Sequence, residues 1–129
     1  MLDELQKQII DFRNDRDWEQ FHAPKNVAEG ICIEAAELLE NFLWKTTEES
    51  RDLSEEEKHA IGEEIADIAI YLLLLSHDLG LDFEEIISQK LKVNGNKYPI
   101  DKCHGIAGKI RGQVRISVQI HKFLLVRVS

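Results

Sequence analysis

Two pairs of acidic residues stand inside segments that are otherwise mostly apolar. Glu34 and Glu37 lie in EAAELLENFLW, and Glu64 and Asp67 lie in EEIADIAIYLLLL. Residues three apart share one face of an α-helix, with Cβ atoms about 5–6 Å apart, so each pair would project its carboxylates together. Burying such charges is costly unless they are paired with cations or bound to a metal ion. The pattern therefore raises the question of what neutralises four acids.

The two segments hold no side chains that could neutralise these acids. Neither Lys nor Arg occurs between Asn26 and Leu43 or between Ala60 and Leu81. Two antiparallel helices would bring the acidic pairs face to face, and an all-oxygen ligand set favours a hard cation, Mg²⁺ or Mn²⁺. Mg²⁺ keeps coordination positions for water and phosphate oxygens, so a phosphate-bearing substrate is expected. A single acidic pair would be typical of a solvated helix; two pairs embedded in apolar residues favour a metal site.

Two other kinds of helical site fit the sequence less well. A carboxylate-bridged di-iron site needs two Glu-x-x-His motifs on helices of one bundle, and Glu56 with His59, which has this spacing, stands at a polar helix start. A histidine–aspartate phosphohydrolase would use His77 and Asp78 but needs further histidines on neighbouring helices. Histidine is favoured near the C-terminal end of a helix dipole, so His77–Asp78 is interpreted as a helix-end pair.

Four helices are predicted to position these residues. Apolar residues recur with helical period from about Asp3 to Asn14, from Asn26 to near Trp44, from Ser54 to Gly80 and from Asp82 to Gly95. Between the first two helices, the polar and aromatic stretch DRDWEQFHAPKN predicts an ordered loop with a short helical turn.

The ends of three predicted helices carry capping signals. Asn26 with Glu29, Ser54 with Glu57, and Asp82 with Glu85 have the spacing of an N-terminal capping box. Gly80 is a C-terminal cap signal for the third helix. That helix is apolar nearly all round from Ile65 to Leu75, which is typical of a helix buried on several sides and, in a short chain, indicates contact with another subunit.

Composition limits the class of protein. The chain has 129 residues, 43% hydrophobic and 31% charged, with a net charge of −8, which predicts one soluble globular domain. Every acid lies at or before Asp101, and this acidic body would repel nucleic-acid polymers. No apolar run is long enough for a membrane helix, and the start lacks the build of a signal peptide. Cys32 and Cys103 are expected to be free thiols in a reducing cytoplasm.

The C-terminal tail differs from the rest of the chain. Residues 109–129 are basic, β-branched and partly alternating. A strand or hairpin, a segment that pairs with a partner, and an extension foreign to the domain all fit this pattern, so an irregular or strand-like tail is expected and plays no part in the functional argument.

The acidic pattern, taken with four further blocks, resembles a known family. Glu34-x-x-Glu37 followed by Glu64-x-x-Asp67 resembles the metal motif of the MazG-like all-α nucleoside triphosphate pyrophosphohydrolases. RDWEQFHAPKN, FLWK, IADIAIYLLLL and KLKVNGNKYP look like the single-domain branch that contains the dCTP pyrophosphatases and integron-borne MazG-like proteins. The resemblance covers about residues 3 to 108 and implies one domain over 1–108; the tail departs from it.

The resemblance implies a reaction and a set of site residues. A (d)NTP would be cut between its α and β phosphorus atoms, with Mg²⁺ (or Mn²⁺) held by the four acids and with Glu37, assisted by Glu34, orienting or deprotonating the attacking water. A close-fitting tyrosine under the sugar would disfavour a 2′-OH, so deoxynucleotides such as dCTP are the expected substrates. The implied substrate-binding residues are Trp18, His22 and Trp44 for the base, Tyr71 for the sugar, and Lys90, Asn94 and Lys97 for the phosphates.

The same resemblance implies a homo-oligomer, a dimer of dimers, that removes unwanted deoxynucleotides. Two alternatives of other kinds remain open at this point. One is a non-enzymatic helical interaction module, such as an antitoxin or adaptor, which would need no metal. The other is a hydrolase that releases a nucleoside diphosphate and phosphate.

Overall fold

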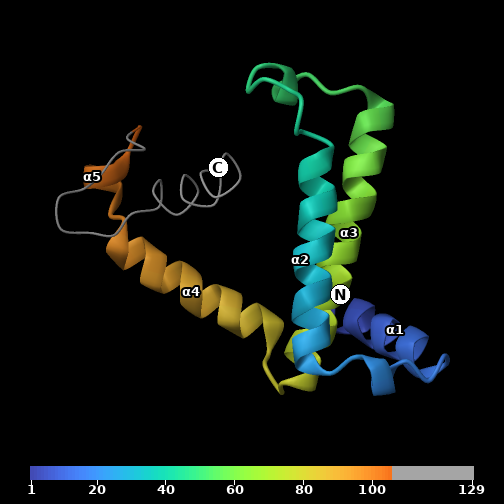
Figure 1. The fold of residues 1–129 in the computed structure, drawn as a ribbon. Coiled ribbons are helices and arrows are strands. Elements are labelled where there is room, and N and C mark those ends of the chain that lie inside the picture. Colours follow the sequence, from blue (N-terminus) through green and yellow to red (C-terminus); the bar gives the residue numbers. More distant parts are fainter. Residues whose placement is uncertain (106–129) are drawn as a thin grey trace. The chain divides into compact units, whose positions relative to one another are not determined.

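The computed structural model describes residues 1–105, and every regular element within them is helical (Figure 1). The predicted all-α fold is therefore confirmed over this range, while the predicted strand-like tail lies outside the described residues. None of the helices in this range is long and apolar enough to cross a membrane. The elements are α1 (Leu2–Asn14), the 3₁₀ turn η1 (Glu19–Phe21), α2 (Pro24–Glu40), the 3₁₀ turn η2 (Glu49–Arg51), α3 (Glu55–Asp78), α4 (Phe83–Lys97) and α5 (Ile100–Cys103).

The chain divides into two compact units. The first, Met1–Phe83, contains α1, α2 and α3 with both 3₁₀ turns; the second begins at Glu84 and contains α4 and α5. Within the first unit α2 and α3 lie side by side, and α1 packs against the C-terminal part of α3 (Figure 1). The predicted loop with a short helical turn between the first two helices is confirmed as η1.

Two contacts fix the register of the α2–α3 hairpin. Near the start of α2, the ring of Tyr71 lies against Gly30. Beyond the end of α2, Lys45 forms an ion pair with Glu57 near the start of α3. As the residue number rises along α2, that of its partner falls along α3, so the helices are antiparallel. This register places the predicted acidic pairs opposite each other.

The boundaries of α2 differ from the sequence prediction. Pro24 occupies the first turn and Ala23 is the N-cap, so the predicted capping box at Asn26 is wrong. Proline suits the first turn because it lacks the N–H that a cap would have to satisfy, and the Asn26 side chain instead donates to the Phe21 carbonyl, at 3.3 Å. The helix ends at Glu40 rather than near Trp44, with Asn41 donating to the Glu37 carbonyl at 3.1 Å.

Both predicted ends of α3 are confirmed. The Ser54 side chain accepts from the Glu57 N–H at 3.1 Å, and the Glu57 carboxylate accepts from the Ser54 N–H at 2.8 Å. At the other end, Gly80 has a φ of +66°, and the N–H of Leu81 donates to the Ser76 carbonyl at 2.8 Å. This is the Schellman arrangement that glycine favours.

The end of α4 was predicted too early. The helix begins one residue after Asp82 but continues through Gly95 to Lys97. A single glycine costs a helix only about 1 kcal/mol, whereas Pro99 disfavours helical backbone at the residue before it. Proline rather than glycine therefore sets this boundary.

The hydrophobic core of the first unit is small. Within the described residues, the buried apolar side chains are those of Val27, Ile61, Leu73 and Leu74. Ile65 and Leu72, on the helix expected to be buried on several sides, remain 54% and 37% exposed. The single chain thus leaves much of the apolar surface of α3 uncovered.

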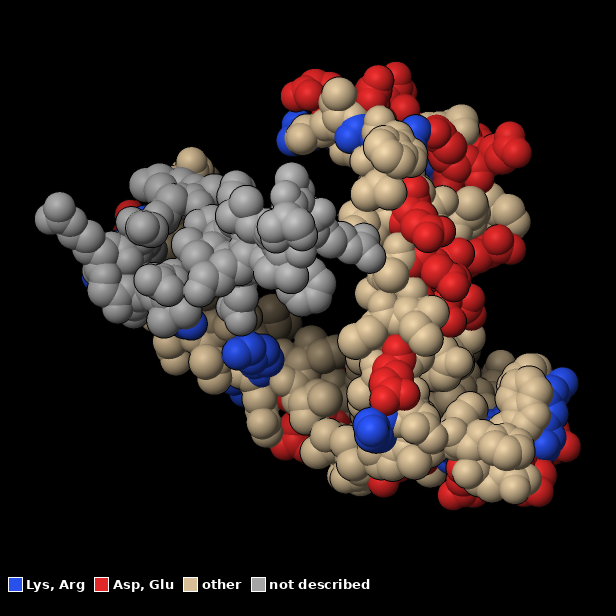
Figure 2. All heavy atoms as spheres, in the orientation of Figure 1, with Lys and Arg blue, Asp and Glu red and all other residues tan. Residues whose placement is uncertain are grey.

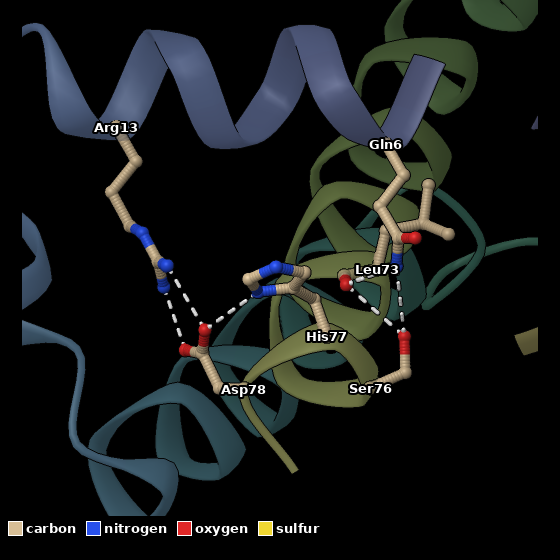
Figure 3. A network of polar contacts seen from close by, with 6 residues as sticks. All are labelled: Gln6, Arg13, Leu73, Ser76, His77 and Asp78. Atoms are coloured by element: carbon tan, nitrogen blue, oxygen red, sulfur yellow. Dashed lines mark hydrogen bonds and ion pairs between the residues drawn. The ribbon is translucent and has the colours of Figure 1, made fainter. Parts of the chain in front are cut away.

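A polar network joins α1 to the C-terminal end of α3 (Figure 3). Arg13, only 2% exposed, donates two hydrogen bonds to the Asp78 carboxylate, at 2.6 and 2.9 Å. Gln6 donates to the Leu73 carbonyl at 2.9 Å. Burial raises the pKa of Asp78, but the hydrogen bonds from Arg13 and His77 outweigh it, and the net pKa lies below its usual value. The interpretation of His77–Asp78 as a helix-end pair is confirmed, since both Asp78 oxygens are engaged by Arg13.

We expect Arg13→Met to destabilise the protein by about 3 kcal/mol, because it leaves the Asp78 charge with little compensation at a site that is 17% exposed. The double variant Arg13→Met/Asp78→Leu should recover much of this loss, since it removes both charges. Urea unfolding at one fixed protein concentration measures both changes. Lys7→Met, which breaks the exposed Lys7–Asp11 pair on the same helix, is the matched control and should change little. A single variant as stable as the control would contradict the role given to this pair.

Candidate functional site

Three of the four predicted acids come together between α2 and α3. One carboxylate oxygen from each of Glu34, Glu37 and Glu64 lies within 4.8 Å of the others. Glu34 and Glu37 share a face of α2 because they are three residues apart, and the antiparallel register brings Glu64 to that face from α3. Figure 2 shows acidic side chains gathered along this hairpin.

Without a cation, burial and mutual repulsion disfavour the ionised carboxylates of this trio. Burial, followed by the negative charges of Glu37, Asp67 and Glu64, raises the pKa of Glu34. Burial, followed by the charges of Glu37 and Asp67, raises the pKa of Glu64. The Glu64 Oε2 atom is buried and has no hydrogen-bond partner within residues 1–105. A buried carboxylate oxygen without a donor fits a divalent cation well, because the cation supplies the missing ligand contact and offsets the repulsion.

Asp67 stands at the edge of this trio. It falls outside the group of oxygens within 4.8 Å, yet its charge raises the pKa of both Glu34 and Glu64. The predicted role of Asp67 as a fourth metal ligand stays a prediction.

Tyr71 and His22 lie beside the trio, toward the start of α2. Tyr71 follows Asp67 by one turn of α3 and therefore shares its face. A Cβ atom on Gly30 would lie 3.1 Å from the Tyr71 Cζ atom, so glycine allows the ring to rest against the backbone of α2. The His22 ring meets Tyr71 edge to face, with centroids 6.3 Å apart. The His22 Nδ1 atom is buried and has no hydrogen-bond partner among the described residues, so it is available to a ligand.

The two tryptophans lie at opposite ends of the hairpin. Trp18, 43% exposed, follows α1 and is anchored to Arg13, which holds Asp78 at the end of α3. Trp44, 91% exposed, precedes Lys45, which pairs with Glu57 near the start of α3. Residues 57 and 78 of one helix are roughly 30 Å apart along its axis. A single chain therefore brings Trp18, but not Trp44, to the end of the hairpin where Tyr71 and His22 lie.

The predicted phosphate-binding residues belong to the second unit. Lys90, Asn94 and Lys97 all lie on α4, and their spacing of four and then three places them on one face of that helix. Lys97 Nζ lies 5.5 Å from the centroid of the Tyr98 ring. Their action on the substrate of the first unit stays a prediction.

Sequence reasoning missed the residues that fix the hairpin register. Gly30 is an isolated glycine inside a helix, a signal of close packing that could have been noticed. The Lys45–Glu57 ion pair had no such signal, because it joins residues on either side of the α2–α3 connection. Both predicted free thiols are found: Cys32 is exposed and Cys103 half-buried.

Comparison with known proteins gives consistent matches. Residues 30–111 match the model of the MazG-like family. The chain is 36% identical over 110 residues to dCTP pyrophosphatase 1 of Bos taurus, covering 84% of this chain and 65% of the bovine protein. It is 35% identical over 100 residues to the Homo sapiens protein of the same name, covering 76% of this chain and 59% of the human one. The chain thus spans less than two thirds of the length of these curated relatives.

A solved structure is also similar. A pyrophosphatase from Archaeoglobus fulgidus superposes with a TM-score of 0.72 at 40% sequence identity. The alignment covers 76% of this chain and 92% of the archaeal one, so the likeness spans nearly that whole protein.

We expect Glu64→Gln to raise the melting temperature of the protein in EDTA at pH 7. The pKa of Glu64 is raised in the folded state, so its ionisation disfavours folding at neutral pH. That penalty is relieved as pH falls through the raised pKa and is absent below the ordinary carboxylate pKa. The difference between variant and wild type should therefore shrink toward pH 4.5, which a series of thermal melts in EDTA measures.

The same melts in the presence of Mg²⁺ or Mn²⁺ distinguish a metal site from a solvated acidic cluster. A concentration of ~10 mM exceeds even a weak dissociation constant. The wild type should be stabilised by the cation and Glu64→Gln much less so. Glu63→Gln removes an exposed neighbouring charge and is the matched control, expected to keep the wild-type response to metal. Equal responses in all three proteins would rule out Glu64 as a ligand.

Proposed function

Because the chain belongs to the MazG-like family, we propose that it is a nucleoside triphosphate pyrophosphohydrolase that converts a (d)NTP to a (d)NMP and pyrophosphate. The observation that carries the proposal is the trio of Glu34, Glu37 and Glu64, in which a buried Glu64 oxygen lacks a partner among residues 1–105. Relatives named dCTP pyrophosphatase 1 support both the position of the cut and a deoxycytidine substrate.

The cation that fits the trio best is Mg²⁺, with Mn²⁺ as a close substitute, because all the ligands are carboxylate oxygens. Glu34 and Glu64, both half-buried, would hold it, with Asp67 as a further ligand. When bound, it would polarise phosphate oxygens and lower the pKa of a water molecule. The acids of this chain then have separate tasks, holding the ion and receiving a proton.

Glu37 is the proposed base. It is the exposed member of the trio, so its second oxygen can reach a water molecule at the mouth of the site. It would orient that water toward the α-phosphorus atom and take up its proton as the bond to the β-phosphate bridge breaks. Glu34 lies beside Glu37 and, as a ligand to the ion, would assist Glu37 by helping to hold that water in place.

The nucleoside would lie toward the start of α2. The Tyr71 ring, held against Gly30, offers a flat surface for the sugar, and a close fit there disfavours a 2′-OH. His22 Nδ1 is a buried polar atom with no partner within the described range and is available to a polar group of the nucleotide. Trp18 would stack on the base. On α4, Lys90, Asn94 and Lys97 are proposed to bind the triphosphate.

We propose that the enzyme is a homo-oligomer, a dimer of dimers. Ile33, Leu39, Ile65 and Leu72 on the α2–α3 hairpin are all exposed in the single chain, and exposed apolar residues gathered on one element favour an interface. Trp44 lies too far from Trp18 to stack on the same base within one chain, so a second copy would supply it. Two free cysteines fit a reducing cytoplasm, where the enzyme would remove unwanted deoxynucleotides.

Two other functions are less well supported. A helical interaction module gives no reason for an unpartnered carboxylate oxygen inside an acidic trio, and it predicts no metal requirement. A hydrolase that releases a nucleoside diphosphate would use the same trio, and the products distinguish it.

We expect the protein with Mg²⁺ to release pyrophosphate and dCMP from dCTP, and to act less well on CTP. Glu37→Gln and Asp67→Asn should each lower kcat/KM on the order of 10²–10³-fold, since the first removes the proposed base and the second a proposed ligand to the ion. Glu29→Gln, on the same helix and paired only loosely with Lys25 at 3.9 Å, is the control and should retain activity. Chromatography of the nucleotide products with a coupled pyrophosphate assay gives both quantities.

Three results would contradict the proposal in different ways. Phosphate and dCDP as products would show that the cut lies between the β and γ phosphorus atoms. Full activity in EDTA would rule out a requirement for a metal ion. No turnover of any deoxynucleoside or ribonucleoside triphosphate with Mg²⁺ or Mn²⁺ would favour the interaction module.

A further inference from the structure

We propose that Asp17 is a positioning residue for nucleotide binding: its left-handed backbone sets the Trp18 indole where it stacks on the nucleobase. The inference rests on the proposed function, because it takes Trp18 as part of the base site. It assigns a role to a residue that has no contact with the acidic trio.

Asp17 has an unusual backbone conformation. Its φ of +54° is the one positive value at a non-glycine residue within residues 1–105. The left-handed region is unfavourable for L-residues, and aspartate and asparagine tolerate it best. The Gln20 side chain donates to both the carbonyl and the carboxylate of Asp17, each at 2.9 Å. The strained turn is therefore held in place by its own contacts rather than left to relax.

The turn folds the chain back onto the end of α1. Directly after Asp17, the Trp18 N–H donates to the Arg13 carbonyl at 3.1 Å. The indole then meets the edge of Phe12, with ring centroids 5.9 Å apart and an interplanar angle of 75°. The Arg16 guanidinium covers Phe12, 3.6 Å from the ring centroid. The same guanidinium lies 5.8 Å from the centroid of the Trp18 ring. Trp18 is thus held through its backbone and by contacts with Phe12 and Arg16, and it remains 43% exposed.

Arg13 relates this loop to α3. Its carbonyl accepts a hydrogen bond from the Trp18 N–H, and its guanidinium donates two hydrogen bonds to the Asp78 carboxylate. Asp78 belongs to α3, the helix that also carries Glu64 and Tyr71. Through Arg13, the loop that carries Trp18 is therefore attached to that helix. Such preorganisation matters because a base and its phosphates must be bound at once, and small misplacements cost rate and affinity.

The test compares the same substitution at two aspartates of one loop. Asp17→Val places a β-branched residue where φ is positive, whereas Asp15→Val places it at a right-handed position with φ −57°. Asp17→Gly removes the side chain but adopts positive φ freely. We expect Asp17→Val to raise KM for dCTP roughly tenfold, within the range for losing one base–aromatic stack, with kcat nearly unchanged. Asp17→Gly and Asp15→Val should keep a KM close to that of the wild type.

A second measurement does not depend on turnover. The chain has two tryptophans, so a Trp44→Phe background makes Trp18 the sole indole reporter. In that background Asp17→Val should make the indole more accessible to acrylamide quenching, whereas Asp17→Gly should leave quenching unchanged. Thermal melts establish that every variant is folded at the assay temperature.

The outcomes separate this inference from the proposed function. A KM for Asp17→Val equal to that for Asp15→Val, or a loss in Asp17→Gly as large as in Asp17→Val, would overturn the backbone role. Trp18→Ala with an unchanged KM in an active enzyme would overturn base stacking while leaving the pyrophosphohydrolase intact. An inactive wild type would overturn the function and this inference with it.

Discussion

The structure depends on a cluster of carboxylates between α2 and α3 that has no neighbouring lysine or arginine on those helices to neutralise it. Glu57 and Glu64 lie two turns apart on α3, yet their pKa values move in opposite directions. The hydrogen bond from Lys45, the largest of several contributions, lowers the pKa of Glu57 to about 2, whereas burial and neighbouring acids raise that of Glu64. The hairpin thus has a lysine within reach of one acid and none at the other. Unneutralised carboxylates are unfavourable for folding, so their arrangement is best explained by a cation that binds there.

The rest of the first unit keeps these acids facing each other against their own repulsion. Gly30 and Tyr71 close one end of the hairpin, and Lys45 and Glu57 close the other. The Arg13–Asp78 pair then fixes α1 and its following loop to α3. Contacts of this kind matter more than usual because few apolar side chains are buried within residues 1–105. They hold the geometry of the site by ring packing on one side of it and by an ion pair on the other.

Sequence alone predicted the features that follow from local spacing. Helical periodicity located α1, α2, α3 and α4, and the pairing of Ser54 with Glu57 marked the start of α3 because a capping box is a local interaction. The errors arose where two local signals competed, as when Pro24 displaced Asn26 from the start of α2. The acidic pairs were visible from a spacing of three, but their grouping depended on the hairpin register, set by Gly30 with Tyr71 and Lys45 with Glu57. The turn at Asp17 has no sequence signature stronger than aspartate itself.

The separation of Trp18 from Trp44 bears on what a complete site requires. A nucleotide is bound at its phosphates and at its base, and stacking on both faces of a base needs two aromatic rings a few ångströms from it. Among the described residues, Tyr71, His22 and Trp18 lie toward one end of the hairpin, the acids lie between its two ends, and Trp44 is exposed at the other end. An exposed indole beside uncovered apolar residues on the same hairpin is unfavourable in water and typical of an interface. In the proposed oligomer, the same exposed surface would both join two copies and carry Trp44 to a neighbouring site.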